Sequence, residues 1–473
     1  GGTNIALGRN TMNLNTTGAD NVAAGHDSLS SNTTGAENVA IGQQALNSNT
    51  TASKNIGLGR MALRDNTTGA NNTALGHQSM IVNTTGYDNV AVGRASLDAN
   101  TDGHSNTAVG ESSLTSNTTG DRNVAIGQNA MAVNTTGSEN VAVGRNALDS
   151  NTTAAGNTAV GDGAGASLTT GGINVAIGHS ALDASTDGQG NVAIGYLAAS
   201  AMNGSNGKWN VAIGYNAMRD TDARFQNTAV GQNALLSNLA HGNAAFGSKC
   251  LEDNTHGDGN NGFGYFCLSS CTTGDNNVAM GTSAGTNITT GNHNTLIGAG
   301  TGATLTTGSQ CILIGREANV SGAGNAELVI GNTVAGQGNN TGKIYPPGGG
   351  AIYQATNGTT FAQTSDERIK KNIVDNNEGL NKLKDIQVRN FEYRTEEEVT
   401  ELPNHLAVKQ EGTQLGVIAQ EIEKVLPEVI KIESSGVKTV NTDNLTWYLI
   451  NAVQELSTQV DELKQEIKTL KGE

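Results

Sequence analysis

Two residues in the C-terminal quarter of the chain, Ser365 and Lys370, have side chains suited to nucleophilic chemistry. A serine hydroxyl is a weak nucleophile until a neighbouring group takes its proton. A lysine can take that proton only where burial lowers its pKa. Residues five positions apart do not share a helical face, so the chain must bend, or the lysine must reach round, for the two to meet. Taken alone, this spacing is a weak signal.

The same segment also has a structural interpretation. Thr364, followed three residues later by Glu367, fits a helix capping box, and acidic residues in a first helical turn suit the helix dipole. On this interpretation Ser365 only begins a helix. The choice between the two depends on the kind of domain that begins here.

The composition of the whole chain indicates a stacked, repetitive structure. Its 473 residues include 63 glycines, 4 prolines and only 3% aromatic residues, too few to fill a deep globular core. Val, Ile, Ala and Leu nevertheless recur too regularly for a disordered chain. A thin solenoid reconciles these two properties.

A short motif, Asn-(Val/Thr/Ile)-small-x-Gly, recurs every 17 residues from Asn4 to Asn191 and resumes at Asn210 after a two-residue insertion. With this Asn as place one, a full unit reads Asn-Val-Ala-Ile-Gly-x-x-Ala-Leu-x-x-Asn-Thr-Thr-Gly-x-x. The Gly at place five is present in all 20 copies, the last at Gly331. So regular a period marks a repeat architecture.

Each unit contains strand and turn signals. Apolar residues at places two and four have the period of a strand, and Asn-Thr-Thr-Gly is turn chemistry. We therefore expect about two short strands and two turns per unit, which is one coil of a parallel β-solenoid. At about 4.8 Å per coil, the 20 copies predict a rod of roughly 95 Å.

The copies also indicate which places face inward. Most have a large apolar residue at place nine and Asn at place twelve, but one copy has Gly165 at place nine and Leu168 at place twelve. The same exchange occurs at Ala199 and Met202, Gly285 and Ile288, and Gly302 and Leu305. Because a close-packed interior conserves volume, both places must share one small cavity.

The four cysteines fit this scheme as small buried residues rather than as a zinc site or a disulfide framework. Cys250 and Cys267 replace the inward Ala at place eight, and Cys271 and Cys311 replace repeat Asn. A disulfide between Cys250 and Cys267, which stack on adjacent coils, is the alternative.

Over about residues 1–331, the repeat resembles the left-handed β-roll heads of trimeric autotransporter adhesins and repeats of phage tail-fibre proteins. The resemblance is specific for architecture and weak for function. It implies a mainly β homotrimer of left-handed β-roll type, in which one face of each rod is buried.

The period fails after Gly331, and residues 332–364 are interpreted as a neck. From Ser365 onward Glu, Lys, Ile and Leu dominate. Over about 445–471, apolar residues alternate at spacings of four and three, which predicts a coiled coil. Its seam comprises Leu449, Val453, Leu456, Val460, Leu463, Ile467 and Leu470.

Three segments of residues 365–473 carry a second resemblance. They read Ser-Asp-Glu-Arg-Ile-Lys-Lys-Asn-Ile from Ser365, Gln-Leu-Gly-Val-Ile-Ala-Gln-Glu-Ile-Glu from Gln414, and Tyr-Leu-Ile-Asn-Ala-Val-Gln-Glu-Leu from Tyr448. Together they resemble the endosialidase-type intramolecular chaperone domain of phage tailspikes and fibres. That family is trimeric, and the resemblance implies an α+β chaperone domain that ends in the coiled coil.

The family cleaves its own chain before the Ser of this motif with a Ser/Lys dyad. Carried over, the resemblance makes Ser365 the nucleophile, Lys370 its base and Thr364–Ser365 the scissile bond. Asp366 and Arg368 fit the motif in supporting roles. This chemistry needs no cofactor.

Charge and hydropathy exclude other classes. The formal charge is -16, no basic stripe suggests nucleic acid, and no apolar run suggests membrane insertion. The eight His residues have no metal-ligand spacing. The chain starts Gly1-Gly2, so we expect an N-terminal attachment region to be missing.

Place six, after the fixed Gly, is mostly polar and therefore faces outward, but it becomes Tyr at Tyr196, Tyr215 and Tyr265. Trp209 lies in the coil of the insertion. Exposed aromatic rings are a common means of binding sugars, so these four residues form a candidate contact with a host-cell receptor or glycan. The alternative is that they pack between protomers.

These observations favour a trimeric virion fibre, assembled in the host cytoplasm, whose C-terminal domain drives folding and then cleaves itself off. A bacterial surface adhesin, located at the cell surface, is the second reading. A glycan-degrading tailspike is the third, although no carboxylate pair can be placed. Ice binding through stacked Thr columns is the fourth.

Overall fold

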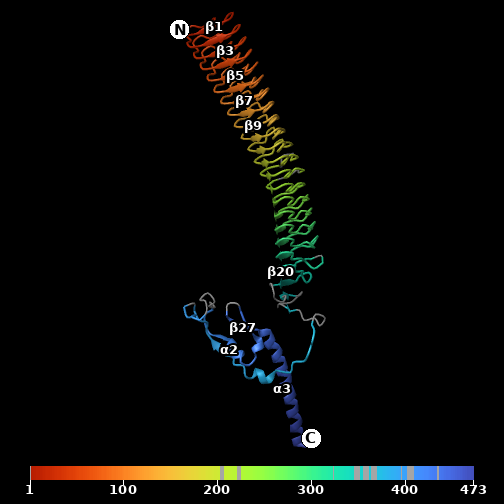
Figure 1. The fold of residues 1–473 in the computed structure, drawn as a ribbon. Coiled ribbons are helices and arrows are strands. Elements are labelled where there is room, and N and C mark those ends of the chain that lie inside the picture. Colours follow the sequence, from red (N-terminus) through yellow and green to blue (C-terminus); the bar gives the residue numbers. More distant parts are fainter. Residues whose placement is uncertain are drawn as a thin grey trace. The chain divides into compact units, whose positions relative to one another are not determined.

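The computed structural model describes residues 2–202, 207–220, 225–322, 324–345, 352–354, 362–363, 370–395, 397–401, 410–433 and 436–472. The chain divides into two compact units, Gly1–Thr364 and Ser365–Glu473. The first is the repeat rod and the second is a small α+β unit (Figure 1).

In the rod, each repeat forms one coil with one three- or four-residue strand at places two to four (Figure 1). Neighbouring strands pair in parallel with a shift of one repeat, as Val124 pairs with Val141. The strands are β1 Ile5–Leu7, β2 Val22–Ala24, β3 Val39–Ile41, β4 Ile56–Leu58, β5 Thr73–Leu75, β6 Val90–Val92, β7 Thr107–Val109, β8 Val124–Ile126, β9 Val141–Val143, β10 Thr158–Val160, β11 Val175–Ile177, β12 Val192–Ile194, β13 Val211–Ile213, β14 Thr228–Val230, β15 Ala244–Phe246, β16 Asn261–Phe263, β17 Val278–Met280, β18 Thr295–Ile297, β19 Ile312–Ile314 and β20 Leu328–Gly331. The predicted parallel β-solenoid is confirmed.

Three further strands follow the last repeat. β21 (Gly342–Tyr345) pairs in parallel with β20, and β22 (Ile352–Gln354) and β23 (Ala362–Gln363) add to it in antiparallel fashion. The parallel ladder therefore extends beyond the last repeat into the segment that we interpreted as a neck.

The prediction of two strands per coil is wrong. The second half of each coil forms turns, because places seven and nine adopt positive φ, as in Asp27 (φ 57°) and Leu29 (φ 50°). Extended backbone is not compatible with these angles. The turns still stack through main-chain hydrogen bonds, as from the Leu29 N–H to the Ala45 carbonyl at 2.9 Å. Propensity alone does not reveal this, because Leu rarely adopts such a φ.

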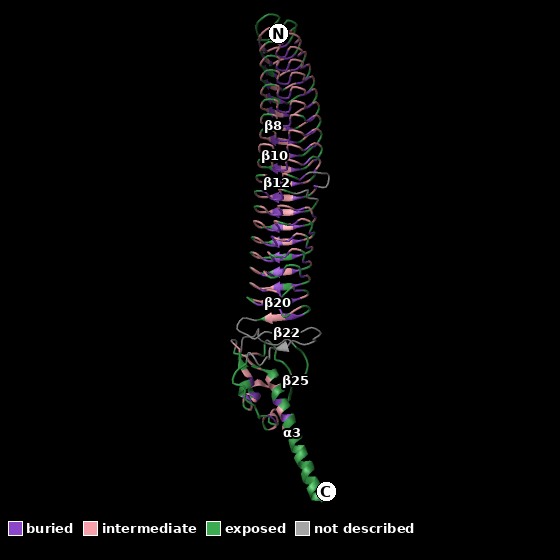
Figure 2. Cartoon of the chain, turned by 90° about the vertical axis from the view of Figure 1, so that its right-hand side faces the viewer, coloured by how far each residue is buried: buried purple, intermediate pink, exposed green. Residues whose placement is uncertain are grey.

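The interior of the rod is a narrow column of stacked side chains. Residues at places three, eight, nine and twelve are buried along the rod, and Figure 2 shows the buried residues following its length. The expected exchange of volume between places nine and twelve is confirmed. A Cβ added to Gly165 would lie 3.0 Å from Cδ1 of Leu168, so the leucine occupies the space that place nine vacates.

Two buried asparagine ladders stabilise the stacked coils. At place twelve, the Asn49 amide donates to Oδ1 of Asn32 at 2.9 Å and to the Ala52 carbonyl at 2.9 Å. At place one, the Asn38 backbone N–H donates to Oδ1 of Asn21 at 2.9 Å, and its amide donates to the same Ala52 carbonyl at 2.9 Å. These bonds satisfy polar groups that would otherwise be costly to bury. The repeat pattern did not predict these ladders.

The four cysteines are buried free thiols, as expected, and Cys250 and Cys267 are not bonded. Cys271 takes over the bond of the Asn it replaces, since its Sγ lies 3.5 Å from the Gly274 carbonyl. Burial raises the pKa of the Cys271 thiol to about 11. The Cys271 thiol is therefore an inert part of the interior.

The glycine at place five allows neighbouring coils to approach closely. Gly127 has a φ of +134°, and a Cβ on it would lie 2.4 Å from the carbonyl oxygen of Gly144 in the next coil. No side chain fits there at any φ. The invariance of this glycine over 20 copies follows from the stacking distance.

We expect Gly127→Ala to disrupt the rod, giving insoluble protein or a large fall in the melting temperature measured by circular dichroism. Gly242→Ala is the matched control, because Gly242 also has a positive φ (+63°) but no atom lies within 4 Å of the added Cβ. It should lose only about 1–2 kcal/mol from the strained backbone. Equal melting temperatures for the two variants would contradict this account of place five.

The second unit has a small core. β24 (Arg389–Phe391) pairs with β25 (Gln414–Gly416), and β26 (Ile430–Ile432) pairs with β27 (Lys438–Val440), both antiparallel. α1 is Leu380–Leu383, α2 is Ala419–Ile422, η3 is Pro427–Val429 and α3 is Thr442–Lys471. The buried core residues are Ile422, Leu426, Val429 and Tyr448.

The helix α3 (Thr442–Lys471) is defined at both ends by capping residues. The Asn441 side chain accepts hydrogen bonds from the backbone N–H groups of Asp443 (3.1 Å) and Asn444 (3.3 Å). Gly472 ends the helix in the left-handed conformation. The helix covers the whole segment for which the sequence predicts a coiled coil.

Candidate functional site

The segment of the expected self-cleavage site is only partly described. Thr364, Ser365, Asp366 and Arg368 lie outside the described residues, as does the alternative capping box with Glu367. Lys370 is the first described residue of the second unit, and its side chain is exposed in the single chain. The roles of these residues therefore remain predictions. A catalytic lysine would have to be buried by something other than the described part of its own unit.

The residues that follow Lys370 lie against α3. The Asn451 amide donates to the carbonyls of Asn376 (2.7 Å) and Glu378 (3.1 Å), and the Leu380 N–H donates to Oε2 of Glu455 at 3.0 Å. Gly379 is needed for this approach, since a Cβ there would lie 2.5 Å from the Ala452 nitrogen. These three hydrogen bonds hold residues 376–380 against α3.

Two polar hollows lie beside this fastened segment. One, of about 540 Å³, is lined by Asn377, Glu378, Gly379, Asn381, Lys382, Asp385, Lys424, Val425 and Glu455. The other, of about 410 Å³, is lined by Val374, Asp375, Asn376, Asn377, Trp447, Tyr448, Asn451 and Gln454. Both are open and polar, which is unlike the apolar enclosure that small-molecule sites usually have.

The seam of α3 has no partner within the described part of its own chain. All seven seam residues have exposed side chains, from 41% for Val460 to 86% for Leu470. Trp447 and Ile450 are exposed as well. In a coiled coil, residues at this heptad spacing are buried by the facing side chains of a partner helix.

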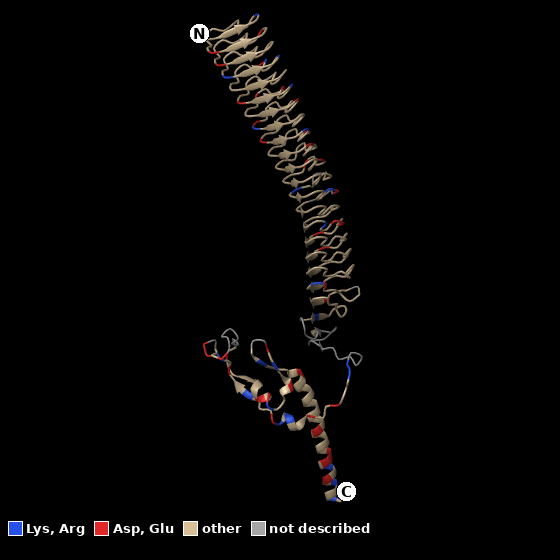
Figure 3. Ribbon diagram, viewed as in Figure 1, with Lys and Arg blue, Asp and Glu red and all other residues tan. Residues whose placement is uncertain are grey.

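The outward face of the rod's sheet is also apolar and unpartnered. At places two and four, large apolar side chains are half-buried or exposed along the rod, for example Ile41 (38%), Ile126 (39%) and Ile297 (39%). The strands β1 to β20 carry no charged residue, and Figure 3 shows charges only beside them. So long an apolar stripe exceeds what a monomeric protein usually leaves in water.

The four aromatic residues proposed to contact a receptor do not gather in one place. Tyr196 and Tyr215 stack with ring centroids 5.4 Å apart, and His179 stacks on the other face of Tyr196 at 5.2 Å. Trp209 precedes strand β13, whereas Tyr215 follows it, and the indole of Trp209 lies beside Gly190. Tyr265 contacts Phe266 edge-to-face further along the rod. Both faces of Tyr196 are thus occupied, which leaves only its edge for a ligand.

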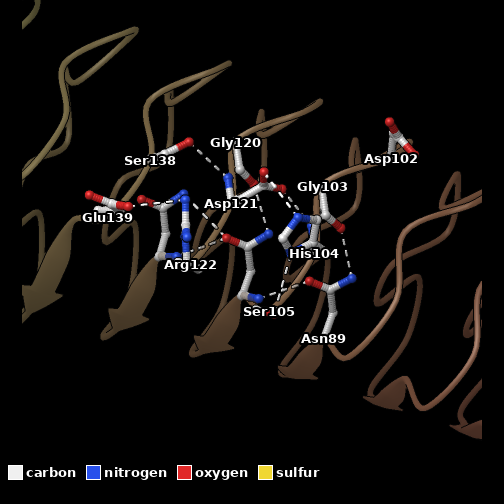
Figure 4. A network of polar contacts seen from close by, with 12 residues as sticks. Asn89, Asp102, Gly103, His104, Ser105, Gly120, Asp121, Arg122, Ser138 and Glu139 are labelled. Atoms are coloured by element: carbon white, nitrogen blue, oxygen red, sulfur yellow. Dashed lines mark hydrogen bonds and ion pairs between the residues drawn. The ribbon is translucent and has the colours of Figure 1, made fainter.

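One polar network on the rod brings together residue types that also occur in hydrolases (Figure 4). His104 lies 3.2 Å from Asp121 and 3.3 Å from the Ser105 hydroxyl. The hydrogen bonds of this network give it a structural role. Oδ1 of Asp121 accepts the backbone N–H of His104 at 2.8 Å, and Oγ of Ser138 accepts the backbone N–H of Asp121 at 3.0 Å. These side chains cap main-chain groups of the preceding coil, so we assign them no catalytic role.

Other kinds of site have no counterpart in the described ranges. There, no group of three or more His, Cys, Asp or Glu side chains could hold a metal ion. None of the helices described is long and apolar enough to cross a membrane.

Comparison with known proteins confirms the resemblance to a phage tail fibre with a C-terminal chaperone domain. Residues 365–431 match the family described as chaperone of endosialidase. The chain is 31% identical over 127 residues to the long tail fiber protein Gp37 of Enterobacteria phage Ox2, covering 26% of this chain and 45% of that protein. It is 30% identical over 171 residues to that of Salmonella phage S16, covering 32% and 21%, and 30% identical over 132 residues to that of Enterobacteria phage M1, covering 27% and 47%. The chain therefore spans less than half the length of these relatives.

Proposed function

We propose that this chain is part of a phage tail fibre that attaches the virion to a host-cell surface. It acts as a homotrimer. Its C-terminal domain brings three chains together, directs the folding of the rod and then cleaves the chain between Thr364 and Ser365. Similarity to three long tail fiber proteins and to the endosialidase chaperone family supports this assignment.

The observation that carries the proposal is the position of one bond. The family match begins at residue 365, and the chain divides into compact units between Thr364 and Ser365. The expected scissile bond is this same bond. Cleavage there would release the whole chaperone and leave the whole rod.

Trimerisation is supported by two apolar surfaces that the single chain leaves in water. One is the seam of α3, and the other is the outward face of the rod's sheet. Association of three parallel chains would bury both. It would also offer a route to bury Lys370, whose exposure in the single chain does not suit a general base.

The test is the mass and assembly state of the expressed chain. We expect intact mass spectrometry to show fragments 1–364 and 365–473, and light scattering to show a trimer of fragment 1–364. A chain that stays full length and monomeric after purification would refute the proposal. A full-length trimer would agree with the proposed trimeric fibre and would refute only the self-cleavage.

A further inference from the structure

The apolar face of the rod has two different edges. Place six lies at one end of each strand, after the fixed Gly, and place seventeen lies at the other end, before the repeat Asn. Five residues separate the two edges across the sheet, and the three that form the strand alone span about 3.3 Å each. A single chain therefore cannot bring its two edges together across its own sheet.

Two coils in the charged part of the rod carry opposite charges at their two edges. The coil with Arg9 at place six has Asp20 at place seventeen. In one of the two coils with an acidic place six, that of Glu111, place seventeen is basic, at Arg122; in the other, Asp162 is matched by Ile173. No coil has like charges at its two edges. Glu111 and Arg122 have side chains 43% and 60% exposed in the single chain.

Within a chain, these charges pair only along the rod. Arg94 contacts Glu111, and Arg122 lies 3.0 Å from Glu139, in each case one coil away on the same edge. These longitudinal pairs explain charge alternation along one edge. They do not explain why both edges of the Glu111 coil have the sign opposite to that of the Arg9 coil.

One coil of the aromatic part of the rod carries aromatic side chains at both edges. The coil with Tyr196 at place six has Trp209 at place seventeen. Gly190 makes room for Trp209, since a Cβ there would lie 2.8 Å from the indole Cδ1. Tyr196 is 46% and Trp209 is 59% exposed. In this coil, both edges therefore present an exposed aromatic ring.

Symmetry relates these observations to the trimer. If three parallel rods turn their apolar faces toward a common axis, the place-six edge of each chain meets the place-seventeen edge of the next. Such an interface joins two different surfaces and closes into a ring. Chains aligned by a shared C-terminal domain present equal coils at equal height.

We propose, on the basis of the trimer proposed above, that the two edges form the contact between neighbouring protomers. Glu111 of one chain faces Arg122 of the next, and Tyr196 of one chain packs against Trp209 of the next. The contacts between opposite charges align equal coils of the three chains, and the contact between Tyr196 and Trp209 stabilises their association. The occupant of each edge is a second copy of this chain.

Engineered cysteines test this arrangement. We expect the full chain carrying Glu111→Cys and Arg122→Cys to form covalent trimers after mild oxidation, seen on non-reducing gels run with an alkylating agent. Each single variant should stay monomeric on the gel, because an interface of unlike surfaces pairs one edge only with the other. The native thiols are buried and should not interfere. Tyr196→Cys with Trp209→Cys should behave in the same way.

The control pair is Glu111→Cys with Thr119→Cys, since Thr119 is exposed at place fourteen, away from both edges. It should give no covalent trimer. Light scattering before oxidation separates the two proposals. A monomer refutes the trimer itself, whereas a trimer without cross-links, or with cross-links in the single variants, refutes only the edge contact.

A second measurement separates protomer contact from receptor contact. We expect Tyr196→Ala with Trp209→Ala to lower the temperature at which the trimer dissociates. An unchanged dissociation temperature together with lost adsorption to host cells would overturn the edge contact in favour of a receptor site.

Discussion

Ser365→Ala should yield an uncleaved chain of 473 residues that still assembles as a trimer. The substitution removes the proposed nucleophile, and loss of a nucleophile lowers the rate of such reactions by on the order of a thousandfold or more. Folding should survive, because the change removes only one oxygen atom. Intact mass spectrometry and unheated gels measure both properties.

Lysine variants extend this test to the base. Lys370→Ala should block or greatly slow cleavage, because no neighbouring group would then take the serine proton. Lys371→Ala is the matched control, since it removes an adjacent exposed lysine of equal charge. If Ser365→Ala is still cut at the same bond, or if both lysine variants are cut as fast as the parent chain, the dyad is wrong.

Deletion of residues 365–473 should leave the rod insoluble or monomeric. A solenoid coil buries only a narrow column of side chains, and the outward apolar face would then lack aligned partners. Sedimentation of the lysate and light scattering of any soluble fraction measure the result. Soluble trimers of the shortened chain would contradict the proposed chaperone role of residues 365–473.

A point substitution tests the same role with less disruption. Leu456→Asp combined with Leu463→Asp places two charges in the seam, where both leucines are about half exposed in the single chain. We expect loss of the trimer and accumulation of uncleaved chain. Thr458→Asp, on the exposed surface between seam positions, is the control and should leave both properties unchanged.

Much of the rod follows from sequence periodicity alone. The interval of 17 residues predicts the coils, and the exchange between Gly165 and Leu168 predicts which places face inward. Both inferences hold because every coil has the same packing environment, so that the 20 copies show which residue types that environment accepts at each place. The match of residues 365–431 likewise follows motifs that are continuous along the chain.

Features that join residues from different coils were decided only by tertiary structure. The asparagine ladders, exemplified by Asn32 and Asn49, depend on main-chain carbonyls of the turns that only stacking brings within reach. The positive φ at Leu29 replaces the expected second strand, because a buried, repeated contact outweighs the intrinsic preference of leucine. The catalytic assignment of Ser365 and Lys370 comes from motif resemblance, which identifies residues but not the burial on which lysine basicity depends. By itself, then, the sequence determined the repeat, its interior and the type of C-terminal domain, whereas the tertiary structure decided how the turns close and which apolar faces one chain leaves exposed.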